Sequence, residues 1–164
     1  MIFLTVGTQF PFDRLVRAVD DCCGALELNE EVFAQIGDST YAPRHFEAAS
    51  SLDKETFDRH VQEASAVIGH AGMGTITMAL DHGKPLLAMP RLKKYGEVVN
   101  DHQVALAEEF EALGHILVAH DADELARKLT QLKSFTPKRR AASVDAVAER
   151  VRCFVQSVER NRGK

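Results

Sequence analysis

The chain has 164 residues, the usual size of one domain, which leaves room for one buried core and little room for two. Hydrophobic residues make up 45% and charged residues 27% of it, so disordered, collagen-like and disulfide-scaffold classes are excluded. With 20 Lys and Arg against 24 Asp and Glu, the formal net charge is -4 and no global basic field attracts a polyanion. We therefore expect no nucleic-acid partner.

Cysteine usage and the N-terminus indicate a reducing compartment. The cysteines are Cys22, Cys23 and Cys153, an odd number without the spacing of a disulfide framework or a zinc site. The first apolar run ends at Val6, which is too short for a signal-peptide core, and no stretch approaches the ~18 apolar residues of a membrane-spanning helix. We expect a cytoplasmic chain whose membrane contact, where it has one, is peripheral.

Short apolar runs alternate with helical patterns along the whole chain. The predicted strands span residues 2–6, 32–36, 44–49, 66–68, 84–89 and 116–118. The predicted helices span residues 11–24, 53–61 with Asp53 as N-cap, 75–81, 104–113 and 121–132, followed by a last helix from Pro137.

Strands that alternate with helices need crossover connections, which predict a mainly parallel sheet with helices on both faces. The sequence thus predicts a single Rossmann-like α/β domain over residues 1–164. Ligands of such sheets bind beyond the carboxyl ends of the strands, so a site is expected in the loops after Val6, Ile68 and Met89.

The segment GHAGMGT, residues 69–75, leaves a buried strand and enters a helix. Glycines let the backbone approach a ligand and the free amides of a helix start favour an anion, so a phosphate is the expected guest. The spacing matches neither a dinucleotide fingerprint nor a P-loop, and a plain tight turn is the alternative.

Three side chains of this segment carry specific expectations. His70 either faces the crevice or is structural, and Thr75 either donates to a phosphate oxygen or caps the helix. A β-branched side chain in place of Gly72 is expected to abolish ligand binding while leaving the fold largely intact.

The loop PRLKKYGEVVNDHQ, residues 90–103, places basic side chains near the same crevice and then presents polar groups at a helix start. Arg91, Lys93 and Lys94 suit phosphate, whereas neighbouring carboxylate and amide groups suit the vicinal hydroxyls of a sugar. A solvated basic loop with Asn100 or Asp101 as helix cap is the alternative. No second cluster with ligand spacing accompanies these residues, so no metal site is expected.

Four segments in the same order and spacing resemble one family: MIFLTVGT with PFDRLV, GHAGMGTITMAL, GKPLLAMPR, and YGEVVNDHQVALA. From Met1 to about Gly114 the chain resembles the small donor-binding subunit of two-component GT-B glycosyltransferases, a group with a family 28 C-terminal-like domain. It includes the dolichol-linked N-acetylglucosamine transferase and transferases of bacterial exopolysaccharide biosynthesis. The resemblance implies a fold equivalent to the C-terminal, nucleotide-sugar-binding half of a GT-B enzyme.

The resemblance also implies a UDP-sugar site. The implied substrate-binding residues are Gly7 and Thr8 in the cleft-facing loop, Gly72, Gly74, Thr75 and His70 at the diphosphate, Asp101 and Gln103 at the sugar, and Arg91 and Asn100 from the same loop. Many such domains hold the ribose with a Glu at the position of Met78, so this chain departs from the pattern there.

The implied reaction is inverting, metal-independent transfer of a hexose from a UDP-sugar to a lipid-linked acceptor. In the family the other half is a separate membrane-associated subunit that holds the acceptor and supplies the base, so no general base is assigned to this chain. No cofactor is expected beside the UDP-sugar.

The last helix, from about residue 137, either packs on its own domain or docks that partner. Docking would keep a cytoplasmic chain at the membrane face. The alternative function is a non-catalytic subunit that binds a UDP-sugar as a sensor or regulator.

Overall fold

The computed structural model describes residues 1–25 and 30–138, and this part of the chain contains one six-stranded sheet in the order β3-β2-β1-β4-β5-β6. All strand pairs in it are parallel, which confirms the predicted α/β class. The strands are β1 (Ile2–Thr5), β2 (Val32–Gln35), β3 (Glu47–Ala49), β4 (Ala66–His70), β5 (Leu86–Met89) and β6 (Leu117–Val118).

The helices follow the predicted order. They are α1 (Asp13–Ala25), α2 (Lys54–Glu63), α3 (Met73–Asp81), the short 3-10 turn η1 (Lys93–Tyr95), α4 (His102–Ala112) and α5 (Ala122–Leu132). Asp53 caps α2 as expected, because its Oδ1 accepts from the Thr56 amide at 2.9 Å. The predicted helix from residue 137 lies outside the described residues, apart from its first two positions.

The edge strand β3 is shorter than the predicted strand over residues 44–49. Its residues 47–49 pair with β2, whereas the amides of Arg44 and His45 donate to the buried carboxylate of Asp20 on α1. These two amides therefore bond to a helix side chain instead of extending the ladder.

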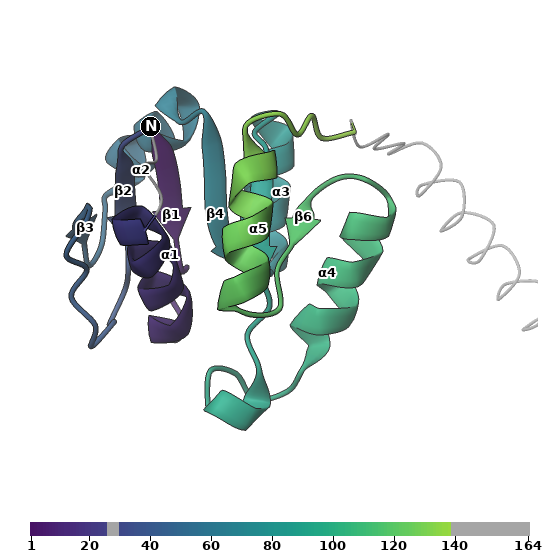
Figure 1. The fold of residues 1–164 in the computed structure, drawn as a ribbon, viewed down its shortest axis with the longest axis horizontal. Helices are drawn as coiled ribbons and strands as arrows, with labels where there is room; N and C mark the ends of the chain where they lie inside the picture. The colour runs from purple at the N-terminus through teal and green to yellow at the C-terminus, as the bar shows by residue number, and fades with distance from the viewer. Residues whose placement is uncertain (26–29, 139–164) are drawn as a thin grey trace, which may run out of the picture.

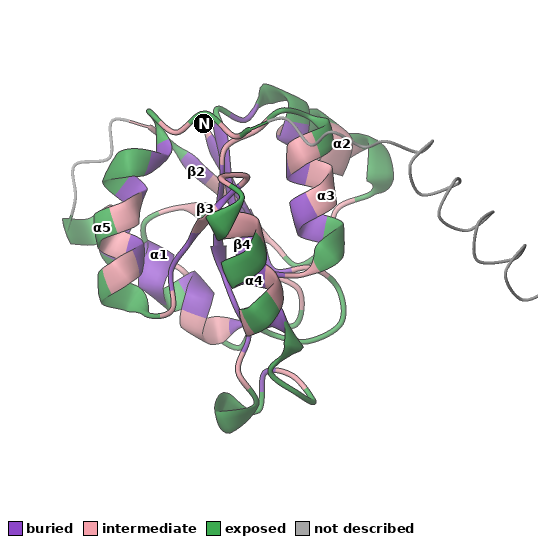
Figure 2. Ribbon diagram, turned by 90° about the vertical axis from the view of Figure 1, so that its right-hand side faces the viewer, coloured by how far each residue is buried: buried purple, intermediate pink, exposed green. Residues whose placement is uncertain are grey.

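Helices cover both faces of the sheet, as Figure 2 shows, with α1 and α5 on one side and α2 and α3 on the other. Alternate residues of β1 explain the two layers, because successive strand side chains point to opposite faces. Ile2 and Leu4 pack with α1 and α5, whereas Phe3 packs with Val61 of α2. A third apolar cluster joins β4 and β5 to α3 and α4.

The carboxyl ends of β1, β2, β4 and β5 meet at one edge of this sheet. The loop between β5 and α4, which contains η1, extends well beyond that edge, at the bottom of Figure 1. Among the described helices none is both long and apolar enough to cross a bilayer.

Candidate functional site

A cavity of about 470 Å³ opens at this edge of the sheet. Eight of the ten residues expected to bind substrate line it: Gly7, Thr8, His70, Gly72, Gly74, Thr75, Arg91 and Gln103. Asn100 and Asp101 lie outside its lining. The opposite wall, which the sequence patterns did not indicate, is formed by Gln35, Ser51, Leu52 and Phe57.

The start of α3 faces the cavity with free backbone amides. Gly72 is the N-cap and makes no side-chain capping bond, and the first intrahelical hydrogen bond runs from the Ile76 amide to Gly72 O at 3.0 Å. The amides of Met73, Gly74 and Thr75 lie ahead of that bond and have no intrahelical partner. Together with the positive end of the helix dipole, they form a binding surface for an anion.

The His70 ring is packed between two glycines. A Cβ atom on Gly7, whose φ is +75°, would lie 2.6 Å from Cε1 of His70, and a Cβ on Gly72 would also collide with the ring. A β-branched residue at position 72 must therefore displace the imidazole, which counts against the expectation that such a change leaves the local structure unaltered. A glycine at position 72 leaves space for the His70 ring, and this packing role is independent of any ligand that the loop binds.

His70 is neutral at physiological pH. Burial is the main cause that lowers its pKa, to about 4, and the nearby Arg91 charge lowers it further. Its Nδ1 lies 3.2 Å from the hydroxyl of Thr75. The Thr75 side chain therefore interacts with the imidazole and does not serve as the N-cap of α3.

Arg91 places a positive charge beside the cavity although only 2% of the residue is exposed. Its Nη2 donates to Val6 O at 2.7 Å and also to Phe10 O, so it ties the loop after β1 to the loop after β5. Burial lowers its pKa and Glu97 acts in the opposite direction, but a guanidinium stays protonated at neutral pH. Its buried Nε has no partner among the described residues.

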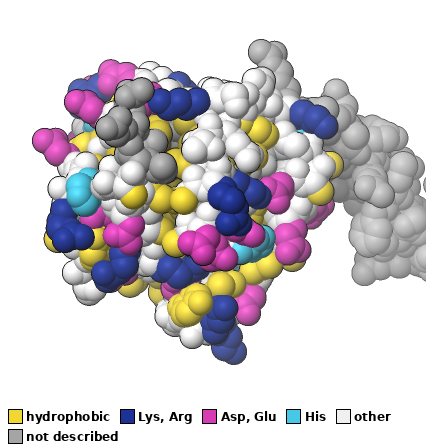
Figure 3. All heavy atoms as spheres, in the orientation of Figure 1, with side chains coloured by type: hydrophobic (Ala, Val, Ile, Leu, Met, Phe, Trp, Pro, Cys, Tyr) yellow, Lys and Arg dark blue, Asp and Glu magenta, His cyan; other side chains and the backbone are white. Residues whose placement is uncertain are grey.

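The two lysines of the same loop are placed differently. Lys93 and Lys94 belong to the exposed turn η1 and do not line the cavity. In Figure 3 hydrophobic and basic side chains gather at the lower tip of the molecule, where Figure 1 shows this turn.

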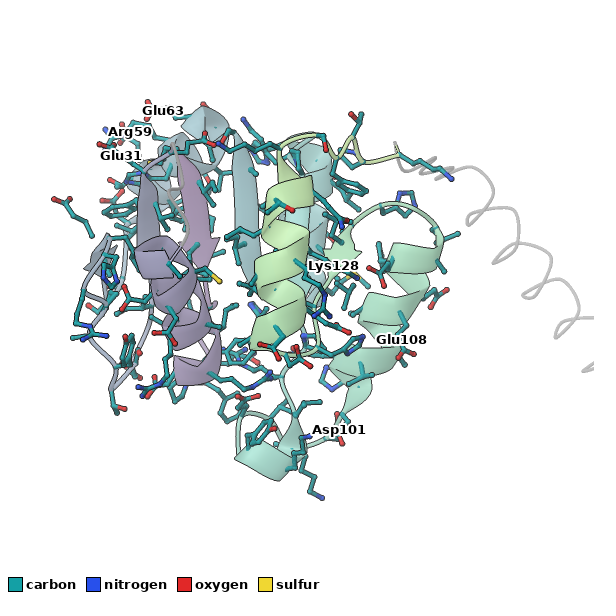
Figure 4. The ribbon with its side chains drawn as sticks, in the orientation of Figure 1. Glu31, Arg59, Glu63, Asp101, Glu108 and Lys128 are labelled. Atoms are coloured by element: carbon teal, nitrogen blue, oxygen red, sulfur yellow. The ribbon has the colours of Figure 1, made fainter. Side chains whose placement is uncertain are left out.

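Three acceptor side chains hold the loop between β5 and α4: Glu97 within the loop itself, and Asp101 and Gln103 where α4 begins. Three consecutive amides donate to them: Arg91 N to Gln103 Oε1 at 3.1 Å, Leu92 N to Glu97 Oε2 at 2.9 Å, and Lys93 N to Asp101 Oδ1 at 2.7 Å. Figure 4 shows Asp101 near the tip of the loop, beyond the strand ends. The Asp101 carboxylate thus shapes the loop, whereas Gln103 keeps its amide Nε2 for the cavity.

Asn100 is a local cap, since its Oδ1 accepts from the His102 amide at 3.2 Å. Asp101 occupies the N-cap position of α4 without a side-chain capping bond.

The sequence pattern described as the "Glycosyltransferase family 28 C-terminal domain" matches residues 1–157. The chain belongs to this family. A curated relative, "UDP-N-acetylglucosamine transferase subunit ALG13" from Mus musculus, is 36% identical over 123 residues, which cover 70% of this chain and 10% of the relative. The chain thus spans about a tenth of the length of that relative, and the share is the same, 10%, for the Homo sapiens protein.

Solved structures share the fold of this family 28 domain. The solution structure of ALG13 matches 92% of this chain and 93% of its own, with a TM-score of 0.61 and 18% identity. The crystal structure of Acinetobacter baumannii MurG matches 82% of this chain and 42% of its own, also with a TM-score of 0.61, at 21% identity. These likenesses confirm the predicted fold class.

The residues of the family 28 cavity differ from those of a metal or carboxylate site. No Asp or Glu lines the cavity, and the described ranges contain no group of three His, Cys, Asp or Glu side chains placed to hold a metal. Met78, at the position where many such domains have a Glu, packs into the apolar clusters on the α2 and α3 side of the sheet. It does not line the cavity either.

Sequence reasoning missed two residues that shape the loop, Arg14 and Glu97. Nε of Arg14 donates to Oε1 of Glu97 at 2.8 Å across 83 positions of the chain. Both residues lie within the segments PFDRLV and YGEVVNDHQVALA, but no local spacing could have shown that these two side chains pair.

Proposed function

We propose that this chain is the donor-binding half of a glycosyltransferase that transfers a hexose from a UDP-sugar. Membership of family 28, and similarity to relatives named as UDP-N-acetylglucosamine transferase subunits, support this proposal. The name "subunit" supports a partner, for which we propose a membrane-associated chain that holds a lipid-linked acceptor. That partner would keep this chain at the cytoplasmic face of the membrane.

The anion-binding start of α3 is the observation that carries the proposal. Three amides without an intrahelical partner, the helix dipole and the buried Arg91 charge all belong to the lining of one cavity. A diphosphate has the charge and the number of acceptor oxygens to use them all. The neutral His70 adds a hydrogen-bonding group there without adding a charge.

The two ends of the cavity suit the two ends of a nucleotide-sugar. Leu52 and Phe57 give one end an apolar wall with the Ser51 hydroxyl beside it, which suits a base. Gln103 and His102 give the other end polar groups that suit sugar hydroxyls. The start of α3 lies between them in this arrangement, where the diphosphate would have to be.

The proposed mechanism divides the chemistry between two chains. As the sugar leaves UDP with inversion, negative charge develops on the diphosphate, and the α3 amides with Arg91 would stabilise it in the role that a metal ion has in other transferases. The acceptor hydroxyl also needs a base. By analogy with the two-component transferases that the chain resembles, we assign that base to the partner.

A thermal-shift panel tests the donor assignment. The purified chain is measured with UDP, UDP-glucose, UDP-galactose, UDP-glucuronic acid, UDP-N-acetylglucosamine, GDP-mannose and NAD. Ligand at 100 times its dissociation constant adds about 2.7 kcal/mol, which moves the midpoint by several degrees. We expect UDP to raise the midpoint and one UDP-sugar to raise it further. Equal shifts with GDP-mannose or NAD, or none with any uridine nucleotide, would contradict the assignment.

Turnover distinguishes an enzyme from a sensor. We expect the chain to transfer sugar when it is combined with an acceptor-binding subunit and a lipid-linked acceptor. UDP-sugar binding without turnover under those conditions would favour the non-catalytic alternative.

A further inference from the structure

Arg14, near the start of α1, lies outside the cavity and joins four segments of the chain. Its side chain is 22% exposed. Its hydrogen bonds run from Nε to Glu97 Oε1 at 2.8 Å, from Nη2 to Glu97 Oε2 and to Pro90 O, both at 2.9 Å, and from Nη1 to His120 O at 3.2 Å. The guanidinium thus connects α1 to the end of β5, to the loop before α4 and to the loop before α5.

Glu97 completes this arrangement from inside the loop. The residue is 8% exposed, and its Oε2 accepts from the Leu92 amide at 2.9 Å as well as from Arg14. The guanidinium carbon also lies 5.0 Å from the centre of the Tyr95 ring and 5.2 Å from that of Phe12. A bidentate pair with two aromatic rings near the guanidinium fixes an orientation as well as a distance.

The loop over residues 90–101 has little structure of its own to maintain its shape. Its regular part is the three-residue turn η1, so its conformation depends on side-chain hydrogen bonds such as those of Glu97. A loop of this kind gains order from each contact and opens when a contact is lost. Its two ends carry Arg91 and Gln103, which line the cavity and bond to each other.

From this geometry we infer that Arg14 and Glu97 are positioning residues for the sugar end of the donor cavity. The inference rests on the proposed function. Neither residue lines the cavity, so each acts through the loop that places Gln103 and His102. The anion-binding amides belong instead to α3, and the Arg91 guanidinium is held by its own bonds to Val6 O and Phe10 O, neither of which involves Arg14. Loss of Arg14 should therefore weaken the hold on the sugar more than the hold on the diphosphate.

The chain offers a matched control for Arg14. Lys128 on α5 pairs with Glu111 at 2.6 Å and also donates to Val118 O, and that Glu111 accepts a backbone amide from Val118 at 2.9 Å. It is the same kind of pair, a cation on a helix holding a carboxylate and a carbonyl. Figure 4 shows Lys128 well away from Asp101 and the loop tip.

The test compares affinities for UDP and for each UDP-sugar of the panel by calorimetry, in the unsubstituted chain and in Arg14→Met, Arg14→Lys and Lys128→Met. The ratio of UDP-sugar to UDP affinity is the readout, because a purely structural loss lowers both alike. For the sugar that the unsubstituted chain prefers, we expect Arg14→Met to lower this ratio about tenfold, the scale of losing hydrogen bonds to a charged group. Arg14→Lys keeps the charge without the planar fork, so its affinity ratio should lie between those of the unsubstituted chain and Arg14→Met. Lys128→Met should leave the ratio unchanged.

The outcomes separate the inference from the proposed function. If the unsubstituted chain binds uridine nucleotides but the ratio in Arg14→Met equals that in Lys128→Met, the positioning role is overturned and the donor site stands. If the unsubstituted chain binds no uridine nucleotide, the proposed function is overturned and this inference with it.

Discussion

The His70 ring occupies the space beside Gly72 that a Cβ atom at that position would need. The same ring lies against the backbone of Gly7 from the other side. Both glycines therefore serve the packing of one imidazole, which in turn contacts the Thr75 hydroxyl at 3.2 Å. The glycine-rich segment is a packed unit before any ligand enters it.

Gly72→Ala should therefore destabilise the fold. We expect a loss of about 1–3 kcal/mol in the free energy of unfolding by urea, because the added methyl group overpacks the site. Adding His70→Ala should relieve the collision, so that the double variant loses less than the sum of the two single changes. Strict additivity would show that the ring and residue 72 do not compete for space.

A side chain at position 74, unlike one at position 72, should fit without a collision, since a Cβ atom there meets nothing within 4 Å. Gly74→Asp places a carboxylate in the first turn of α3, where the helix dipole stabilises it by about 0.3–1 kcal/mol. The same charge repels a diphosphate, so UDP affinity should fall at least about tenfold while the thermal midpoint is kept or raised. The isosteric Gly74→Asn is the control and should retain most of the UDP affinity. Equal UDP affinity in the two variants would contradict the anion assignment.

Stability should fall with acid because of His70. The pKa of this histidine is about 4 in the folded chain and near 6.5 when unfolded, so the unfolded state takes up the proton first. Its contribution is complete above pH 6.5 and is lost as the pH falls toward 4, by about 3 kcal/mol in total. Urea unfolding at pH 7.5 and pH 5 measures the larger part of this loss, about 2 kcal/mol, and His70→Asn should show a smaller difference between these two pH values. An equal difference in both proteins would rule out a low pKa for His70.

Replacing the buried carboxylate of Asp20 by an amide should destabilise the fold. Burial raises the pKa of this fully buried carboxyl, but hydrogen bonds from Tyr41, His45 and Arg44 outweigh that effect and hold the pKa below its usual value. In Asp20→Asn the side-chain NH₂ group replaces one carboxylate oxygen and faces groups that are themselves donors. We expect this change to lower the free energy of unfolding by about 1–3 kcal/mol. The exposed neighbour Asp21→Asn is the matched control and should change stability little. Equal effects of the two changes would contradict this account of the loop that follows β2.

The fold could be predicted because its signals are local. Leu15, Val16 and Val19 recur at helical spacing, and all three are buried in α1. Short apolar runs became parallel strands, since a strand covered on both faces is apolar throughout. The predicted strands over 2–6, 32–36, 84–89 and 116–118 are one or two residues shorter in the structure. The strand over residues 44–49 lost three residues, because the Arg44 and His45 amides bond to Asp20, a partner 24 positions away from Arg44 that no local pattern reveals.

The sequence indicated most of the residues expected to line the candidate site, but it did not indicate the hydrogen bonds that hold them in place. Glycines after a buried strand indicated the start of α3, and Arg91 and Gln103 indicated the second loop. The sequence could not show that Arg91 is buried under the loop after β1, or that Asp101 holds the Lys93 amide. These contacts join segments far apart in the chain or depend on how a loop turns back.

The most direct test of the central claim, that the start of α3 binds a nucleotide diphosphate, is a titration of the isotope-labelled chain with UDP followed by amide NMR shifts. The account predicts saturable changes that are largest at the amides of Met73, Gly74 and Thr75, with smaller changes along the cavity wall. Saturable binding with its largest changes outside the cavity, or no change at those three amides, would contradict it.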